Sequence, residues 1–204
     1  MKRNVIALGW NCGPSLMTVD KGLRPRKADG YKTCPFDYMN TNYDGLVECI
    51  RDDFKYFCDT DYLKIVEFPH VFSALNFNGH KIIVNTKYNF VFNHESGGHG
   101  ELWKDENWPC QDFYEKDNFR EFCNRYNRRI ENFRNYVNSE NGVTFYISKV
   151  NNSKETNVEL DNAFRTTYPN ADIDFFFMEE TYHQHFNEGM YLMHKLVPEL
   201  AAQT

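Results

Sequence analysis

The stretch from Val143 to Met178, VTFYISKVNNSKETNVELDNAFRTTYPNADIDFFFM, has the pattern of a strand, a helix and a second strand. VTFYIS and DIDFFFM are short apolar runs rich in β-branched and aromatic residues, whereas NVELDNAFRTTYP has helical spacing between them. A strand, helix and strand within about 35 residues form a βαβ unit, which requires the two strands to be parallel. This stretch therefore predicts an α/β fold.

A third strand is expected close to the N-terminus, at Val5–Leu8. This run is almost continuously apolar, which is typical of strands buried on both faces of a parallel sheet. We therefore expect Val5–Leu8, Val143–Ser148 and Ile173–Met178 to be central strands of one sheet.

Helices are predicted to flank this sheet. Pro14 suits a first helical turn, because its missing N–H has no partner there in any case. Apolar residues then repeat at helical spacing at Leu16, Val19 and Leu23. The segment TNYDGLVECIRDDFKYFC indicates a second helix, with Asn42 or Asp44 as its cap. Two more helices are expected from about Gln111 to Val137 and near Asn187 to Leu200.

The middle of the chain, from Ile65 to Phe92, changes to alternating apolar and polar residues. An Asn78-Gly79 pair within it is a strong signal for a β-hairpin turn. The fold class predicted is therefore α/β, a mixed sheet with a parallel βαβ core, an inserted antiparallel hairpin and flanking helices. At 204 residues, the default expectation is a single domain over 1–204.

Composition and charge narrow the class of protein. The net charge of −6 argues against binding to nucleic acid or to an anionic membrane. The apolar run at the N-terminus is shorter than the roughly 7–15 residues of a signal-peptide core, so we expect a cytoplasmic protein. Six cysteines occur without a CxxC pair, which favours buried thiols in a reducing compartment over disulfides.

Cys12 is the first candidate for chemistry, because it lies between the predicted first strand and first helix. The N–H groups and dipole of a helix N-terminus stabilise a thiolate there, and they can hold an oxyanion. The amides around Gly13 and Ser15 are the candidate oxyanion donors. The alternative is that Cys12 is a small buried thiol packed behind the helix.

His94 is the best placed base, since it follows the apolar strand NFVF at its carboxyl end. Asp37, a lone acid in CPFDYM, is the first guess for the residue that orients the imidazole, and a turn or cap role is an equal alternative. Arg128 and Arg129 in the long helix are candidate anion ligands. Their alternative role is a structural ion pair, for which Asp37 is a candidate partner.

Two other kinds of site have weaker support. A metal site would need ligands drawn from His94, His99, Glu179, Glu180, His183 and His185, and no metal motif such as HExxH links them. Gly97, Gly98 and Gly100 form a weak candidate for a phosphate-binding loop. We therefore expect neither a metal nor a cofactor.

Taken together, VIALGWNCGPSL, GLR, PFDYM, the strand ending in His94, YNRRIENFRNYV and VTFYIS resemble a known family. It comprises the bacterial and viral proteins grouped as putative papain-like cysteine peptidases, domain of unknown function 1796. The resemblance covers roughly Val5 to Met178, and it differs at Glu95, where the family usually has aspartate, and at Tyr38, where it tends to have tryptophan. It implies a Cys–His pair at Cys12 and His94, and an α+β papain-like fold as the alternative to our α/β prediction.

The leading hypothesis is a thiol hydrolase or acyl transferase. Cys12 would attack a carbonyl group of a peptide or of a small acyl or glycan substrate, and His94 would transfer the proton. The alternative is a module without this catalysis that binds a sugar, a nucleotide or a phosphorylated ligand at the strand ends. The sequence leaves the oligomeric state open.

Overall fold

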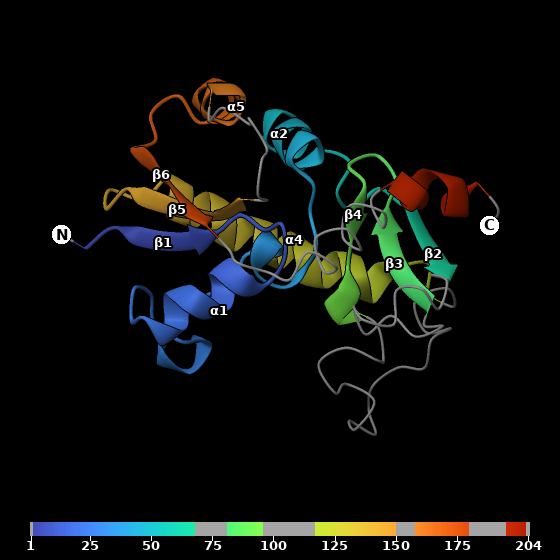
Figure 1. The fold of residues 1–204 in the computed structure, drawn as a ribbon, viewed down its shortest axis with the longest axis horizontal. Coiled ribbons are helices and arrows are strands. Elements are labelled where there is room, and N and C mark those ends of the chain that lie inside the picture. Colours follow the sequence, from blue (N-terminus) through green and yellow to red (C-terminus); the bar gives the residue numbers. More distant parts are fainter. Residues whose placement is uncertain (1, 68–80, 96–116, 150–157, 180–194, 203–204) are drawn as a thin grey trace.

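The computed structural model of the chain describes residues 2–67, 81–95, 117–149, 158–179 and 195–202. Within them, β1 (Asn4–Ala7), β5 (Val143–Lys149) and β6 (Ile173–Glu179) form a parallel sheet in the order β1-β5-β6 (Figure 1). Ile6 pairs with Phe145, and Phe145 pairs with Phe175. The predicted sheet of three parallel strands is therefore confirmed, with β5 at its centre.

One face of this sheet is covered by helices that carry aromatic side chains. α5 (Val158–Thr167) connects β5 to β6 in the order expected of a βαβ unit. Phe164 of α5 packs 4.5 Å from Phe145, centroid to centroid, and Phe133 of α4 (Arg120–Val137) stacks on Phe145 at 5.7 Å. The alternation of Val143, Phe145 and Ile147 along β5 directs their side chains to this core.

The predicted hairpin region forms a sheet of its own rather than joining the parallel strands. β2 (Leu63–Glu67), β3 (Lys81–Asn85) and β4 (Phe90–Val91) are antiparallel in the order β2-β3-β4. The predicted α/β class, with a parallel core and antiparallel hairpin strands, is thus confirmed, although these strands form two sheets rather than one. The second sheet has its own apolar cluster, in which a helix at 195–201 packs through Val197 (Figure 1). The Asn78-Gly79 turn lies outside the described residues.

The prediction for α2 (Tyr43–Arg51) agrees with the structure at the start of the helix, whereas the prediction for the buried face of α1 (Gly13–Asp20) does not. α2 begins as expected, because the Asn42 side chain accepts a hydrogen bond from the Gly45 amide at 2.7 Å. In α1, by contrast, Leu16 is 52% exposed, and Ser15 and Thr18 are buried instead. The predicted apolar face of α1 is wrong because its inward side surrounds a buried ion pair, described below.

The long helix α4 connects the two sheets (Figure 1). Its apolar side is buried, at Phe122, Tyr126, Ile130, Phe133 and Val137. It begins at Arg120, and residues 111–116 of the predicted helix, like the predicted start of the last helix near Asn187, lie outside the described part. None of the described helices is long and apolar enough to cross a membrane.

Phe36 is the centre of the aromatic core. It lies in the short 3₁₀ turn η2 (Pro35–Tyr38) and contacts the rings of Phe54, Phe57, Phe90 and Phe133 at centroid distances of 5.6 to 6.3 Å. These rings belong to α4, to β4 and to the segment after α2. Because ring contacts fix the position of η2 from several sides, the residues next to Phe36 are held rigidly.

Candidate functional site

Cys12 is the N-cap residue of α1, at the end of the loop that follows β1, and its side chain is partly exposed. This loop is held against the segment after η2. The Trp10 amide donates to Thr41 Oγ1 at 3.0 Å, and the Thr41 amide donates to the Trp10 carbonyl at 3.1 Å. Gly9 permits the approach, since its φ is +88° and a Cβ there would lie 2.4 Å from Thr41 Oγ1.

Asn11 occupies the position next to Cys12 and is 3% exposed. Its Oδ1 accepts a hydrogen bond from the Gly13 amide at 2.6 Å. Its Nδ2 is buried and has no hydrogen-bond partner among the described residues. The Gly13 amide, which the sequence suggested as an oxyanion donor, is therefore already engaged, whereas the Asn11 side chain next to Cys12 keeps a buried donor without an acceptor.

Ser15 and Asp37 belong to a buried polar network around Arg24. Arg24 Nη1 lies 2.7 Å from Asp37 Oδ1, and the Arg24 and Asp37 side chains are only 3% and 0% exposed. Arg24 also donates to the Ser15 hydroxyl, and Ser15 donates to Asp37 Oδ1 at 3.3 Å. The Ser15 side chain is thus part of the scaffold behind α1 rather than an anion ligand.

The other oxygen of Asp37 is equally occupied. Oδ2 accepts hydrogen bonds from the Cys34 amide at 2.8 Å and from the Tyr31 hydroxyl at 3.1 Å. The alternative of an ion pair between Asp37 and Arg128 or Arg129 is wrong, because Arg24 is the arginine that pairs with Asp37. With both oxygens engaged in this way, the contacts of Asp37 support a structural role and give no support to an orienting role toward His94.

Burial and charge in this network perturb its titratable groups. Burial, with the nearby Asp37 carboxylate, raises the pKa of the Cys34 thiol well above its ordinary value. Burial likewise raises the pKa of Tyr31. Burial alone would lower the pKa of Arg24, but the Asp37 carboxylate raises it overall. Cys34 and Tyr31 therefore keep their protons, and Arg24 its charge, at neutral pH.

His94 lies in the 3₁₀ turn η4 (Asn93–Glu95), which follows β4 as the sequence indicated. Its ring meets the ring of Tyr38 edge to face, with centroids 5.2 Å apart. Before His94 in the chain, the ring of Phe92 packs on the ring of Phe122 of α4, with centroids 4.8 Å apart. After His94, Glu95 forms an ion pair with Arg125 of α4. The turn that carries His94 is thus anchored to α4 at both ends.

Residues 40 and 41 connect the Cys12 loop to the His94 strand. The Asn40 amide donates to the Val91 carbonyl at 2.8 Å, and the Val91 amide donates to the Asn40 carbonyl at 2.9 Å. Thr41, the next residue, holds Trp10 as described above. Parallel strands in one sheet would bring the ends of two strands, and so these two loops, to the same edge. Here β4 is antiparallel and lies in the second sheet, so the segment 40–41 links the Cys12 loop to the His94 strand instead.

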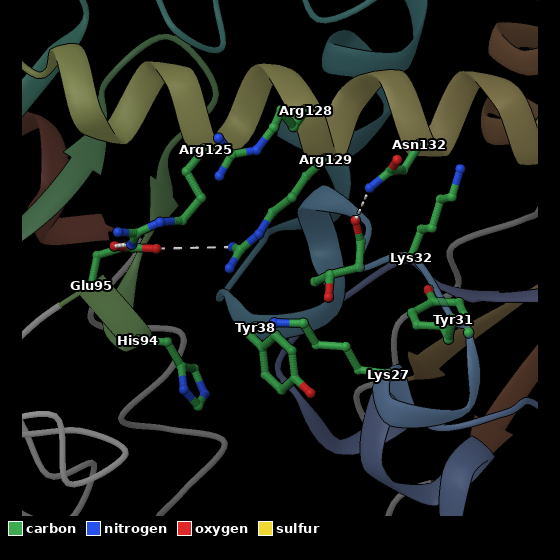
Figure 2. Close-up of a pocket in the computed structure, with 12 residues that line it drawn as sticks. Lys27, Tyr31, Lys32, Tyr38, His94, Glu95, Arg125, Arg128, Arg129 and Asn132 are labelled. Carbon is green, nitrogen blue, oxygen red and sulfur yellow. Dashed lines mark hydrogen bonds and ion pairs between the residues drawn. The ribbon is translucent and has the colours of Figure 1, made fainter.

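A cavity of about 810 Å³ opens beside His94 and Tyr38 (Figure 2). Arg125, Arg128 and Arg129 of α4 line one wall, and Lys27 and Lys32 come from the loop before η2. Cys12 is not among the lining residues. The sequence had named Arg128 and Arg129 as anion ligands. The sequence analysis missed Arg125, although Arg125 lies three and four residues before Arg128 and Arg129, a spacing that places helical residues side by side. The sequence gave no signal for Lys27 and Lys32.

The remaining candidates of the sequence fall outside the described residues or lack support within them. His99, Glu180, His183, His185 and the glycines at 97, 98 and 100 lie outside. In the described part of the chain, no group of three or more His, Cys, Asp and Glu side chains could hold a metal ion.

Two other thiols form a close pair. Cys123 Sγ lies 3.4 Å from the Cys58 carbonyl oxygen. A hydrogen bond between the two side chains lowers the pKa of Cys123 and raises that of Cys58. Cys123 is partly exposed, so it is a thiol against which the reactivity of Cys12 can be compared.

Comparison with known proteins identifies a family but no individual relative. The family model "Putative papain-like cysteine peptidase (DUF1796)" matches residues 3–178. No curated protein and no solved structure matches the chain significantly. The matched segment contains the Cys12 loop, the PFDY turn, the His94 turn and all of the parallel sheet except its last residue, Glu179. Since the match spans most of the sequence, the chain belongs to the family of putative papain-like cysteine peptidases.

Proposed function

We propose that the protein is a thiol hydrolase or acyl transferase in which Cys12 is the nucleophile and His94 the general acid and base. The observation that carries this proposal is the pair of connections at residues 40 and 41, which bind the Cys12 loop on one side and the His94 strand on the other. The family description supports a cysteine hydrolase in general terms. The position of Cys12 before α1 supports its ionisation, because a helix N-terminus stabilises a thiolate.

The chemistry requires only these two side chains and water. The Cys12 thiolate adds to the carbonyl carbon of an amide, ester or thioester, and the protonated His94 gives its proton to the leaving group as that bond breaks. The acyl group is then bound to Cys12. Water, or another nucleophile in a transferase, attacks this thioester while His94 accepts its proton, and the thiolate is regenerated.

Asn11 is the candidate for stabilising the oxyanion formed in both steps. Its Nδ2 is a buried donor next to Cys12, without a hydrogen-bond partner in the structure. Its orientation is fixed, because Oδ1 already accepts from the Gly13 amide. A fixed donor of this kind gains an acceptor when the carbonyl oxygen becomes negative, which lowers the barrier. The amides at the start of α1 would add to it.

Alkylation kinetics test the proposed pair without knowledge of the substrate. Iodoacetamide labelling is followed at each thiol by mass spectrometry as a function of pH. We expect Cys12 to react fastest, with an apparent pKa below the free value of about 8.5. His94→Ala should slow labelling at Cys12 and shift its profile toward that value. Cys123 serves as the internal control, since its acidity arises from Cys58 and should not respond to His94.

Acylation by p-nitrophenyl acetate separates the role of Asn11 from that of the pair. This reaction passes through an oxyanion, whereas alkylation by iodoacetamide does not. Asn11→Ala should therefore slow acylation of Cys12 by about 10²-fold or more and leave its alkylation rate nearly unchanged. Cys12→Ser should abolish acylation and preserve the fold.

One result would overturn the proposal. If the rate and pH profile at Cys12 are the same in the wild type and in His94→Ala, the two residues do not act together. The protein would then be a binding module without this catalysis. The cationic cavity beside His94 favours that second function, with a sugar phosphate, a nucleotide or another anionic ligand as its occupant.

A further inference from the structure

The cavity beside His94 is strongly cationic although the chain as a whole carries a net charge of −6. Among the lining residues, Lys27, Lys32, Arg125, Arg128 and Arg129 are cations, whereas Glu95 supplies the one carboxylate. A concentration of one sign of charge in a hollow raises the local concentration of ligands of the opposite sign. In an acidic protein, such a concentration of basic residues indicates a specific anionic ligand.

Glu95 offsets only one of these five positive charges. Its side chain is 2% exposed, and it is shared between two arginines, with Arg125 in contact and Arg129 Nη1 at 3.9 Å from Oε1 (Figure 2). Arg129 Nη1 is buried and makes no hydrogen bond in the described part of the chain. A buried guanidinium nitrogen in this state favours an additional oxygen ligand.

The other three cations have no acidic partner among the residues that the structure describes. Arg128 is exposed at the rim, on the same face of α4 as Arg125 and Arg129. Lys27 and Lys32 are exposed and come from the loop that faces α4 (Figure 2). Their charges are therefore available to a ligand that enters the cavity.

The arrangement of the cations distinguishes between kinds of anion. A site for one phosphate brings several donors, often backbone amides at a helix N-terminus, to a single point. Here the cations are side chains spread along the middle turns of α4 and along the opposite loop (Figure 2). The volume of about 810 Å³ is near the upper end of the range for ligand pockets and exceeds the needs of a single phosphate group. An extended ligand with several separate negative charges fits this distribution.

We propose that the cavity binds an acidic peptide segment of the substrate, with glutamate or aspartate carboxylates paired to Arg128, Lys27 and Lys32. Arg129 takes a further carboxylate near Glu95, and Tyr38 and His94 contact the peptide at the end where the reactive carbonyl lies. The peptide nature of the ligand rests on the proposed thiol chemistry at Cys12 and His94. The anionic nature rests on the cavity alone.

Binding is measured in the full chain carrying Cys12→Ser, so that no turnover can occur. The probe is an N-acetylated peptide of alternating glutamate and alanine with an uncharged fluorophore, and the matched peptide has glutamine in place of glutamate. Fluorescence anisotropy at low salt should give at least about tenfold tighter binding of the glutamate peptide, and the difference should shrink near 1 M salt as screening shortens to about 3 Å.

Matched variants locate the binding. The double variant Lys27→Gln with Arg128→Gln should weaken binding of the glutamate peptide by about tenfold, because the loss of each exposed charge weakens binding by about a few-fold. Lys21→Gln with Arg51→Gln removes the same charge from exposed positions outside the cavity lining, and should change binding by less than about twofold.

Each remaining outcome decides the matter. Equal binding of the two peptides, or equal losses in the two double variants, would overturn the proposal. Tight binding of inorganic pyrophosphate with no binding of the glutamate peptide would overturn the peptide class and retain an anion site. Peptide binding with unchanged labelling of Cys12 in His94→Ala would refute only the catalysis. Slower labelling of Cys12 in His94→Ala, together with no binding of the glutamate peptide, would refute only the acidic peptide.

Discussion

The buried pair of Arg24 and Asp37 allows a test of what the PFDY motif does. Asp37→Asn removes the negative charge opposite Arg24. The new NH₂ group must also face hydrogen-bond donors, because the carboxylate now accepts from Arg24, the Cys34 amide and the Tyr31 hydroxyl. Arg24 cannot move into water, because its side chain is only 3% exposed. Removing one partner of a pair this deeply buried costs about 3–5 kcal/mol. That is a large part of the roughly 5–15 kcal/mol by which proteins of this kind are stable.

Urea unfolding followed by circular dichroism measures the effect. With a denaturant slope of about 2 kcal/mol/M, the loss corresponds to a fall of about 1.5–2.5 M in the midpoint. The control is Asp172→Asn, which breaks the pair of Arg3 with Asp172, side chains that are 30% and 70% exposed. A surface pair contributes about 1 kcal/mol or less, so the control should lower the midpoint by no more than about 0.5 M.

The result also decides between the two roles that the sequence left open for Asp37. If Asp37→Asn lowers the midpoint no more than Asp172→Asn does, the buried pair is not the source of stability that its geometry indicates. If, in addition, Asp37→Asn slows the labelling of Cys12 as strongly as His94→Ala does, Asp37 orients the imidazole and our structural interpretation fails.

Two further results are expected. In urea unfolding, Gly9→Ala should destabilise the protein by about 1–3 kcal/mol more than Gly22→Ala does. Both glycines have a positive φ, but only a Cβ at Gly9 would meet Thr41. Equal losses in the two variants would mean that this close approach is unimportant. The free energy of unfolding should fall as pH rises above about 8.5, by up to about 1.4 kcal/mol per pH unit for each of Cys34 and Cys49. The reason is that burial raises the pKa of both thiols in the folded state, so they keep their protons at a pH at which the unfolded thiols ionise. A midpoint that stays constant between about pH 8 and 10 would contradict it, and Cys49→Ala should reduce the slope by up to about 1.4 kcal/mol per pH unit.

The sequence predicted the elements whose residues carry a strong local pattern. The apolar runs at Val143–Ser148 and Ile173–Met178 are parallel neighbours, because a βαβ connection leaves little choice of direction. Val5–Leu8 joins the same sheet as a parallel neighbour of the first of these runs. The apolar side of α4 and the Asn42 cap of α2 follow from helical spacing and from capping chemistry. The place of His94 directly after β4 followed in the same way.

Packing decided what periodicity could not. The apolar spacing of Leu16, Val19 and Leu23 suggested an inward face for α1, yet Leu16 is exposed, because the inward side must satisfy Arg24 and Asp37. No local pattern shows that an arginine in a polar loop will be buried. The hairpin likewise has the same alternation whether it joins the parallel sheet or forms a second sheet with its own apolar cluster.

For the candidate site, the sequence by itself determined the residue types, whereas only the tertiary structure decided their neighbours. Cys12 before a helix, His94 after a strand and arginines at 128 and 129 are recognisable from chemistry and spacing. The connection through residues 40 and 41 and the approach of Lys27 to α4 join segments far apart in the chain. Contacts of this kind depend on how elements dock, which is a sum of many weak packing terms that no short stretch of sequence encodes.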